Sequence, residues 1–113
     1  MKLIKYKTDT SEYTYYMEDG IKIRHGICRA WFEIDQLEYE KNYQDGKLHG
    51  LQREWYFNGQ LGLEYNYKDG DLHGPCREWY RSGQLESEFY YQEGTEYESE
   101  GAYREALIAN KVW

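Results

Sequence analysis

Alternation of apolar and polar side chains is the clearest pattern in the chain. Between residues 60 and 68 every second residue is a leucine or a tyrosine: Leu61, Leu63, Tyr65 and Tyr67. A period of two is typical of a β-strand with two different faces. Residues 51–57 just before it are rich in aromatic and extended-chain side chains, and Asn58-Gly59 between the two runs is a strong hairpin turn signal. The pattern therefore predicts a β-hairpin over residues 51–68.

The same hairpin pattern recurs with an offset of 24 residues. The stretch DGKLHG at 45–50 returns as DGDLHG at 69–74, and REWY at 53–56 returns unchanged at 77–80. An earlier copy keeps the same phase from His25-Gly26 onward, and a worn copy begins at Glu93-Gly94. Two strands and two turns account for such a period, so stacked hairpins should form a sheet that grows along one axis.

We therefore expect an all-β fold, an elongated antiparallel β-meander of stacked hairpins. Residues 1–18 should form an N-terminal capping hairpin, residues 19–94 three repeats, and residues 95–113 a degenerate repeat that serves as a C-terminal cap. The texture of residues 99–110, SEGAYREALIAN, favours a short helix that covers the last edge of the sheet.

The register within each hairpin has two solutions. A two-residue loop at Asn58-Gly59 places Arg53 opposite Glu64, a pair of opposite charge. The same rule pairs Arg77 with Glu88 and Arg29 with Glu40. A three-residue loop with a bulge at Gly59 instead places Trp55 on the same face as both leucines of the alternating run. Burial of the tryptophan favours the second solution, because an exposed ion pair contributes little.

Composition and charge narrow the classes of function. The chain has 113 residues, of which 14 are basic and 21 acidic, and its net charge is −7. This charge argues against nucleic acid, and it makes membrane binding unlikely, because nucleic acids and anionic lipids are themselves negative. Aromatic residues make up 19%, which excludes a disordered chain. The N-terminal stretch carries charges where a signal peptide needs an apolar run, so we expect a cytoplasmic protein, in the host cytoplasm or the virion if it is viral.

Groups that could carry chemistry are spread out in rows. His25, His49 and His73 recur once per unit, and adjacent units lie about 10 Å apart, so no two of these side chains can share a zinc ion. Cys28 and Cys76 should lie about 19 Å apart, too far for a disulfide. Catalysis needs dissimilar groups that meet at one point. We therefore predict a non-enzymatic protein with no catalytic residues, no metal site and no cofactor.

Aromatic and acidic side chains are the candidate interaction residues. The repeat should align three tryptophans and three turn glycines as structural residues: Trp31, Trp55, Trp79, Gly26, Gly50 and Gly74. The candidate interaction surface combines an aromatic row on the face opposite the tryptophans, the tyrosines of the partner strands and four C-terminal glutamates: Phe32, Tyr56, Tyr80, Tyr43, Tyr67, Tyr91, Glu93, Glu96, Glu98 and Glu100. Either one face of the sheet exposes its rings for binding, or twist and stacking close both faces.

The repeated unit D-G-x-L-H-G-x-x-R-E-W-Y-x-x-G-Q-L-x-x-E-x-x-Y resembles the variant MORN repeat (membrane occupation and recognition nexus) over about residues 19–94. The resemblance implies an elongated, twisted β-meander. It also implies two sources of function, since many bacterial proteins with these repeats are labelled antitoxins and many others form multi-copy families in large DNA viruses of amoebae.

Three functions follow as hypotheses. The first is a repeat scaffold that binds another protein, or a second copy in a homodimer, through its aromatic and acidic sheet surfaces. The second is an antitoxin that neutralises a cognate basic toxin, because complementary charges speed association. The third, which the resemblance alone suggests, is a viral structural or host-interaction repeat protein.

Overall fold

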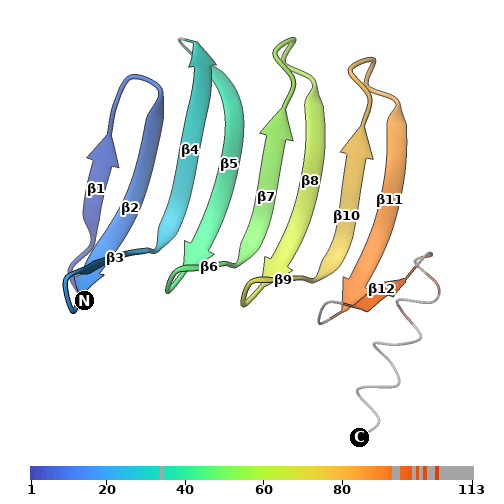
Figure 1. Cartoon of the computed structure of the whole chain (residues 1–113). Coiled ribbons are helices and arrows are strands. Elements are labelled where there is room, and N and C mark those ends of the chain that lie inside the picture. Colours follow the sequence, from blue (N-terminus) through green and yellow to red (C-terminus); the bar gives the residue numbers. More distant parts are fainter. Residues whose placement is uncertain (34, 93–94, 98, 100, 102–103, 105–113) are drawn as a thin grey trace, which may run out of the picture.

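The computed structural model describes residues 1–33, 35–92, 95–97, 99, 101 and 104. These residues form one antiparallel sheet, seen face-on in Figure 1. Its strands are β1 (Ile4–Lys7), β2 (Ser11–Glu18), β3 (Ile21–Arg24), β4 (Gly26–Glu33), β5 (Gln36–Gln44), β6 (Lys47–Leu48), β7 (Gly50–Trp55), β8 (Leu61–Lys68), β9 (Asp71–Leu72), β10 (Gly74–Trp79), β11 (Leu85–Gln92) and β12 (Thr95–Tyr97). The predicted all-β meander of stacked hairpins is confirmed.

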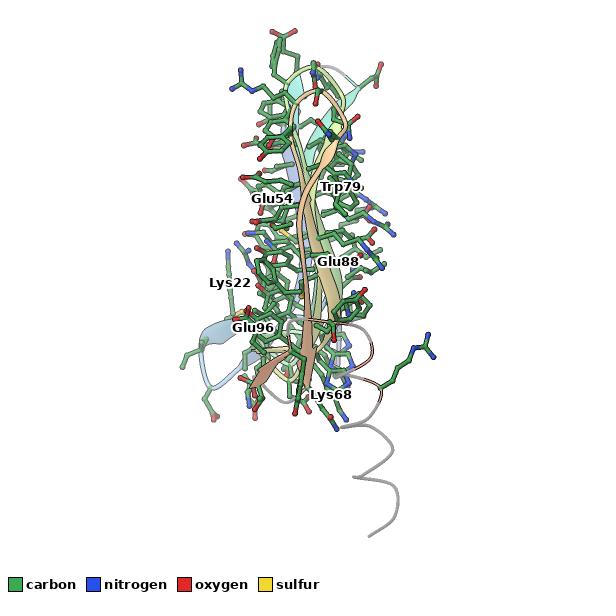
Figure 2. The ribbon with its side chains drawn as sticks, turned by 90° about the vertical axis from the view of Figure 1, so that its right-hand side faces the viewer. Lys22, Glu54, Lys68, Trp79, Glu88 and Glu96 are labelled. Carbon is green, nitrogen blue, oxygen red and sulfur yellow. The ribbon has the colours of Figure 1, made fainter. Side chains whose placement is uncertain are left out.

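The strands lie in the sheet in the order in which they occur in the chain. The long path is β1-β2-β4-β5-β7-β8-β10-β11-β12, while the short strands β3, β6 and β9 pair with β2, β5 and β8. The sheet is a plate of 43 × 41 × 14 Å. Figure 2 shows this plate edge-on, with side chains on both sides and no second layer of described residues over either face.

Few side chains are fully buried in such a plate. Among the described residues, those that are nearly inaccessible are Cys28, Ala30, Cys76, Tyr90, Glu12, Gln52 and Gln92. Most other strand residues are half-buried by their neighbours in the same face. The sheet is thus held by cross-strand contacts between side chains rather than by a central core.

The Asp-Gly dipeptides form the turns at one end of the sheet. In Asp19-Gly20, Asp45-Gly46 and Asp69-Gly70 both residues have positive φ, 50–51° for aspartate and 77–89° for glycine. Positive φ at both central positions defines a type I′ turn, whose twist matches that of the flanking strands. The turn is closed by cross-strand pairs such as Lys68 with Asp71.

At the other end of the sheet, the loop of the β7–β8 hairpin contains three residues, and the loop of the β10–β11 hairpin has the same hydrogen bonds. The N–H of Gly59 donates to the carbonyl of Tyr56, and the N–H of Tyr56 donates to the carbonyl of Gln60, both at 2.9 Å. Gly59 has a φ of 87°, as a three-residue loop with a left-handed last position requires. Trp55 therefore lies opposite Leu61, as the three-residue solution predicts.

A second bulge restores the other predicted pairing. Between Glu54 and Trp55 the register shifts, so that Gly62 has no partner on β7 and Glu54 pairs with Leu63. Arg53 then lies opposite Glu64. The equivalent pairs are also in register: Arg29 with Glu40 and Arg77 with Glu88.

The three-residue register therefore holds next to the loop, where Trp55 pairs with Leu61, and the two-residue register holds beyond the bulge, where Arg53 pairs with Glu64. The prediction that Trp55 shares a face with both Leu61 and Leu63 is wrong for Leu63. The bulge at Gly62 changes the parity of β8, so Leu63 points to the opposite side of the sheet from Leu61.

Successive hairpins are joined around a break in the ladder at His49-Gly50. Gly50 has a φ of 96°, which favours glycine. The N–H of His49 donates to the carbonyl of Asn42 at 2.9 Å, and the amide of Asn42 donates to the carbonyl of Leu51 at 2.7 Å. The next junction repeats these bonds with His73, Asn66 and Pro75. The asparagine side chain thus satisfies a carbonyl that the interrupted ladder leaves without a backbone donor.

The predicted C-terminal helix lies mostly outside the described residues. Of residues 99–110 the structure describes only 99, 101 and 104. Before them, β12 pairs with β11 and forms the last strand of the path. Among the described residues, no helix has the length and apolar character needed to cross a membrane.

Candidate functional site

The two faces of the sheet differ in chemistry. Alternation and register place paired arginines and glutamates on one side, which we call the Arg–Glu face: Lys5, Glu12, Arg29, Glu40, Arg53, Glu64, Arg77 and Glu88. The other side, the tyrosine face, carries Tyr6, Tyr13, Tyr15, Tyr39, Tyr43, Tyr65, Tyr67, Phe89 and Tyr91. Figure 2 shows Trp79 and Glu88 on the first side and Glu54 on the second.

A continuous row of ion pairs crosses the Arg–Glu face. Nε of Arg53 lies 2.8 Å from Oε2 of Glu64, and Nη1 of Arg53 lies 3.9 Å from Oε1 of Glu40. The same two contacts recur at Arg29 and Arg77, and Lys5 extends the row to the first strand. The row contains as many cations as carboxylates, so it neutralises itself and leaves no charge for a partner.

The carboxyl groups at the two ends of this row, Glu12 and Glu88, have lowered pKa values. The guanidinium of Arg29, which donates to Glu12, lowers the pKa of this buried carboxyl. The guanidinium of Arg77 and the hydroxyl of Tyr90 lower the pKa of Glu88 in the same way. Both glutamates are therefore held in the charged form.

The cations of the tyrosine face lie over aromatic rings. The guanidinium of Arg24 lies 4.7 Å from the ring centroid of Tyr13 and 5.6 Å from that of Tyr43. Two further contacts of this kind join Lys22 to Tyr15 at 4.9 Å and Lys41 to Tyr39 at 4.7 Å. Such cation–π contacts orient the cations but leave their charge uncompensated.

The carboxylates of the tyrosine face accept hydrogen bonds from neutral groups. Glu54 accepts from the amide of Gln52 at 3.2 Å. Glu78 accepts from the hydroxyl of Tyr65 at 2.8 Å and from that of Ser87 at 3.0 Å. Burial and the bond to Glu78 raise the pKa of Tyr65, so this phenol stays protonated as a donor.

A shallow hollow of about 280 Å³ lies beside these carboxylates. Its lining combines acidic and aromatic groups: Glu54, Trp55, Tyr56, Gly62, Leu63, Glu78 and Glu86. Gly62 shapes this hollow, because a Cβ atom at this position would lie 3.0 Å from the ring of Tyr56. The arrangement can receive a cationic side chain.

The predicted aromatic residues divide into two groups. The tyrosines Tyr43, Tyr67 and Tyr91 each lie opposite a repeated glycine, near the Asp-Gly turns. These glycines are Gly26, Gly50 and Gly74, and all three have positive φ. A tyrosine ring opposite a glycine covers the glycine backbone, which has no side chain of its own to shield it from water.

The second predicted group lies at the other end of the hairpins. The ring centroid of Phe32 lies 5.5 Å from that of Phe57, and the hydroxyl of Tyr56 donates to the carbonyl of Trp79 at 2.7 Å. Tyr80 is 49% exposed. These contacts join neighbouring loops, so the structure does not combine the two groups into one continuous row.

The tryptophans occupy equivalent positions at the ends of their strands. Trp31, Trp55 and Trp79 lie opposite Leu37, Leu61 and Leu85, respectively. Each Trp–Leu pair follows the bulge that shifts the register, so the pair packs on the Arg–Glu face.

Of the four predicted glutamates only Glu96 is described. It lies on the tyrosine face opposite Tyr91, whose hydroxyl donates to it at 3.3 Å. Glu93, Glu98 and Glu100 lie outside the described residues.

Several tyrosine-face residues were not among the predicted site residues. They are Tyr6, Tyr13, Tyr15, Tyr39, Tyr65 and Phe89, together with the cations Lys22, Arg24 and Lys41. The alternation in SEYTYYM at 11–17 could have indicated Tyr13 and Tyr15. The cations could not be assigned to a face, because that assignment depends on the breaks at His25-Gly26 and at the hairpin bulges.

The histidines and cysteines have structural positions. Nδ1 of His25 accepts from the N–H of Asp45 at 3.2 Å, and Nδ1 of His49 accepts from that of Asp69 at 3.3 Å, so each links one turn to the next. Cys28 and Cys76 are buried free thiols. Within the described part of the chain, no three His, Cys, Asp or Glu side chains are grouped so that they could hold a metal ion.

The fold and the two faces define a repeat protein built from stacked β-hairpins. Residues 48–69 and 72–93 each match the family described as the MORN repeat variant, so residues 48–93 carry two repeats of this type. MORN repeats are commonly non-enzymatic modules in protein or membrane interaction. No curated protein and no solved structure gives a significant match to the chain.

Proposed function

We propose that the chain is a non-enzymatic binding module that contacts another protein through its tyrosine face. The observation that carries this proposal is the difference between the two faces. The ion-pair row of the Arg–Glu face neutralises its own charges, whereas the tyrosine face combines half-buried rings with cations and carboxylates that lack an ionic partner among the described residues. Aromatic rings and arginine are enriched at the centre of protein interfaces, and complementary charges fix the orientation of the partner.

A photoreactive amino acid tests which face binds. Tyr67 and Lys68 are neighbours on β8, so their side chains point to opposite faces. We expect p-benzoylphenylalanine at position 67 to cross-link the chain to a protein, whether a host protein or a second copy. The same group at position 68 is the matched control and should give no such product. Equal cross-linking from both positions, or none from either, would contradict the proposal.

The antitoxin and viral hypotheses stay predictions. An antitoxin would have to bind a basic toxin, and the acidic Asp-Gly turns along one end of the sheet would suit such a partner. Co-expression with the product of a neighbouring toxin gene tests this hypothesis, which fails if the chain gives the cells no protection.

A further inference from the structure

We infer that the chain forms a homodimer in which the tyrosine faces of two copies pack together with their strands nearly at right angles. This inference rests on the proposed function, because it names the protein that the tyrosine face binds. Its basis is the distribution of charge over this face. The cations of this face, Lys22, Arg24 and Lys41, come from β3 and β5, before the central strand β7, whereas the carboxylates Glu54, Glu78 and Glu96 come from β7 and from strands after it.

Charges of opposite sign are therefore present on the same face but not paired there. Among the described residues, Lys22, Arg24 and Lys41 form no ion pair and lie over tyrosine rings. Glu54 and Glu78 accept only from neutral donors. A second copy related by two-fold symmetry would supply the missing partner to each half, since such an interface is self-complementary.

The register fixes where the central charges lie. Lys41 is on β5, the neighbour of β7, and level with Gln52, while Glu54 lies two residues further along β7. Measured from the Cα atom of Gln52, the Cα atom of Lys41 is thus about 4.8 Å away perpendicular to the strands, and that of Glu54 is about 6.6 Å away along the strand. A two-fold axis at about 45° to the strands exchanges these two directions. It places Lys41 of one copy over Glu54 of the other.

The same axis pairs the outer charges. Arg24 is on β3, which lies in line with β4 because both strands pair with β2. It is thus two strands before β7 in the sheet, toward the end that carries the Asp-Gly turns. Glu78 lies on β10, two strands after β7 and toward the loop end. Exchange of the two directions brings Arg24 over Glu78. Near-perpendicular crossing is one of the two common ways in which sheets pack face to face.

One alternative, with aligned strands and the axis along the central strand β7, is unfavourable. A two-fold axis parallel to the strands and through β7 keeps Glu54 on the axis, so it places the Glu54 carboxylates of the two copies against each other. Like charges in contact across an interface are strongly unfavourable. The diagonal axis avoids this contact and satisfies Lys41 at the same time.

The surface is large enough for a stable dimer. The plate measures 43 × 41 Å, so half of one face offers the roughly 800 Å² per partner of a standard interface. The hollow between Glu54, Glu78 and Glu86, with Tyr56 in its wall, lies where the cations of the second copy arrive. Carboxylates with an aromatic wall suit a guanidinium or an ammonium group.

Charge reversal tests the pairing of Lys41 with Glu54. Sedimentation velocity on the full chain, 13.7 kDa as a monomer, should show a wild-type dimer at micromolar concentration. Lys41→Glu alone and Glu54→Lys alone should each weaken dimerisation at least about tenfold, because like charges then meet twice. A one-to-one mixture of the two variants should restore the dimer, since both contacts in the mixed pair are of opposite sign.

Lys68 and Asp71 give the matched control. They lie opposite each other next to the Asp69-Gly70 turn, on the Arg–Glu face. Lys68→Glu and Asp71→Lys change the charge by the same amounts and should leave the dimer unaffected, alone or mixed. Circular dichroism checks that each variant is folded. A mixture of Lys41→Glu and Glu54→Lys that stays monomeric would overturn the inference.

A second measurement needs no variant. Equal amounts of ¹⁴N- and ¹⁵N-labelled wild-type chain are mixed and treated with a carbodiimide, which joins an ammonium group directly to a carboxylate. We expect a peptide pair of mixed isotope that links Lys41 to Glu54. A strictly monomeric wild-type chain contradicts the homodimer, but if position 67 still cross-links to a host protein, the proposed function stands. A dimer whose mixed-isotope cross-links lie only on the Arg–Glu face contradicts both the inferred homodimer and the proposed function.

Discussion

Nε of Arg53 donates to Oε2 of Glu64 at 2.8 Å across a hairpin, while the same guanidinium lies 3.9 Å from Glu40 of the preceding hairpin. One side chain thus connects three strands and two repeats. We expect Arg53→Ala to lower the free energy of unfolding by about 1 kcal/mol, because the pairs are partly exposed. Urea denaturation measures the change, and Lys68→Ala, which removes a cation outside the row, should have almost no effect.

Gly62 and Tyr56 are coupled by close approach. A Cβ atom at position 62 would lie 3.0–3.3 Å from three atoms of the Tyr56 ring. Gly62→Ala should displace this ring, weaken its hydrogen bond to the Trp79 carbonyl and cost about 1–2 kcal/mol. In a Tyr56→Ala background the same substitution should cost much less. Equal costs in both backgrounds, measured by thermal unfolding, would contradict the steric explanation.

The amide of Asn66 satisfies a carbonyl between two hairpins. It donates to the carbonyl of Pro75 at 2.7 Å, and proline offers no N–H in return. We expect Asn66→Ala to destabilise the chain by about 1–2 kcal/mol, because it leaves a partly buried acceptor without a donor. Asn42→Ala should behave alike, since Asn42 donates to Leu51 in the same way. Chemical denaturation of both variants provides the comparison, and a neutral result at both positions would contradict the assigned role.

Acid should destabilise the sheet through the ends of the Arg–Glu row. The folded pKa of Glu12 and of Glu88 is lowered, chiefly by hydrogen bonds from Arg29 and Arg77. Their stabilisation is therefore present above the unfolded carboxyl pKa of about 4.3 and is lost as pH falls through the lower folded pKa. The melting temperature should fall below about pH 5, and Glu12→Gln should flatten this dependence. An unchanged slope in the variant would exclude Glu12 as a contributor.

The fold could be predicted because its determinants are local and repeated. The offset of 24 residues, the Asp-Gly and Asn-Gly signals and the alternation at 60–68 are all visible in the chain. The register could not be settled, because the residue in the second bulge is Gly62 in one hairpin but Glu38 and Glu86 in the others. Without a common residue type the bulge leaves no repeated signal.

The candidate site was less predictable for the same reason. The face on which Lys41 or Glu54 lies depends on the number of bulges between it and the nearest recognisable turn. The tyrosines opposite glycines, such as Tyr67 opposite Gly50, could be named in advance, because both positions recur with the repeat. The division of cations and carboxylates between the halves of one face emerges only when every strand is in register.

The way in which the ion-pair row ends has a consequence for assembly. At one end Lys5 contacts Glu12, and at the other both oxygens of Glu88 are already used, one by Arg77 and one by the hydroxyl of Tyr90. The exposed ammonium of Lys5 is therefore the one group of the row that the ion pairs of the described residues leave largely in solvent. Attachment of another chain edge to edge would rest mainly on the backbone groups of the outer strands and not on a continuation of the row.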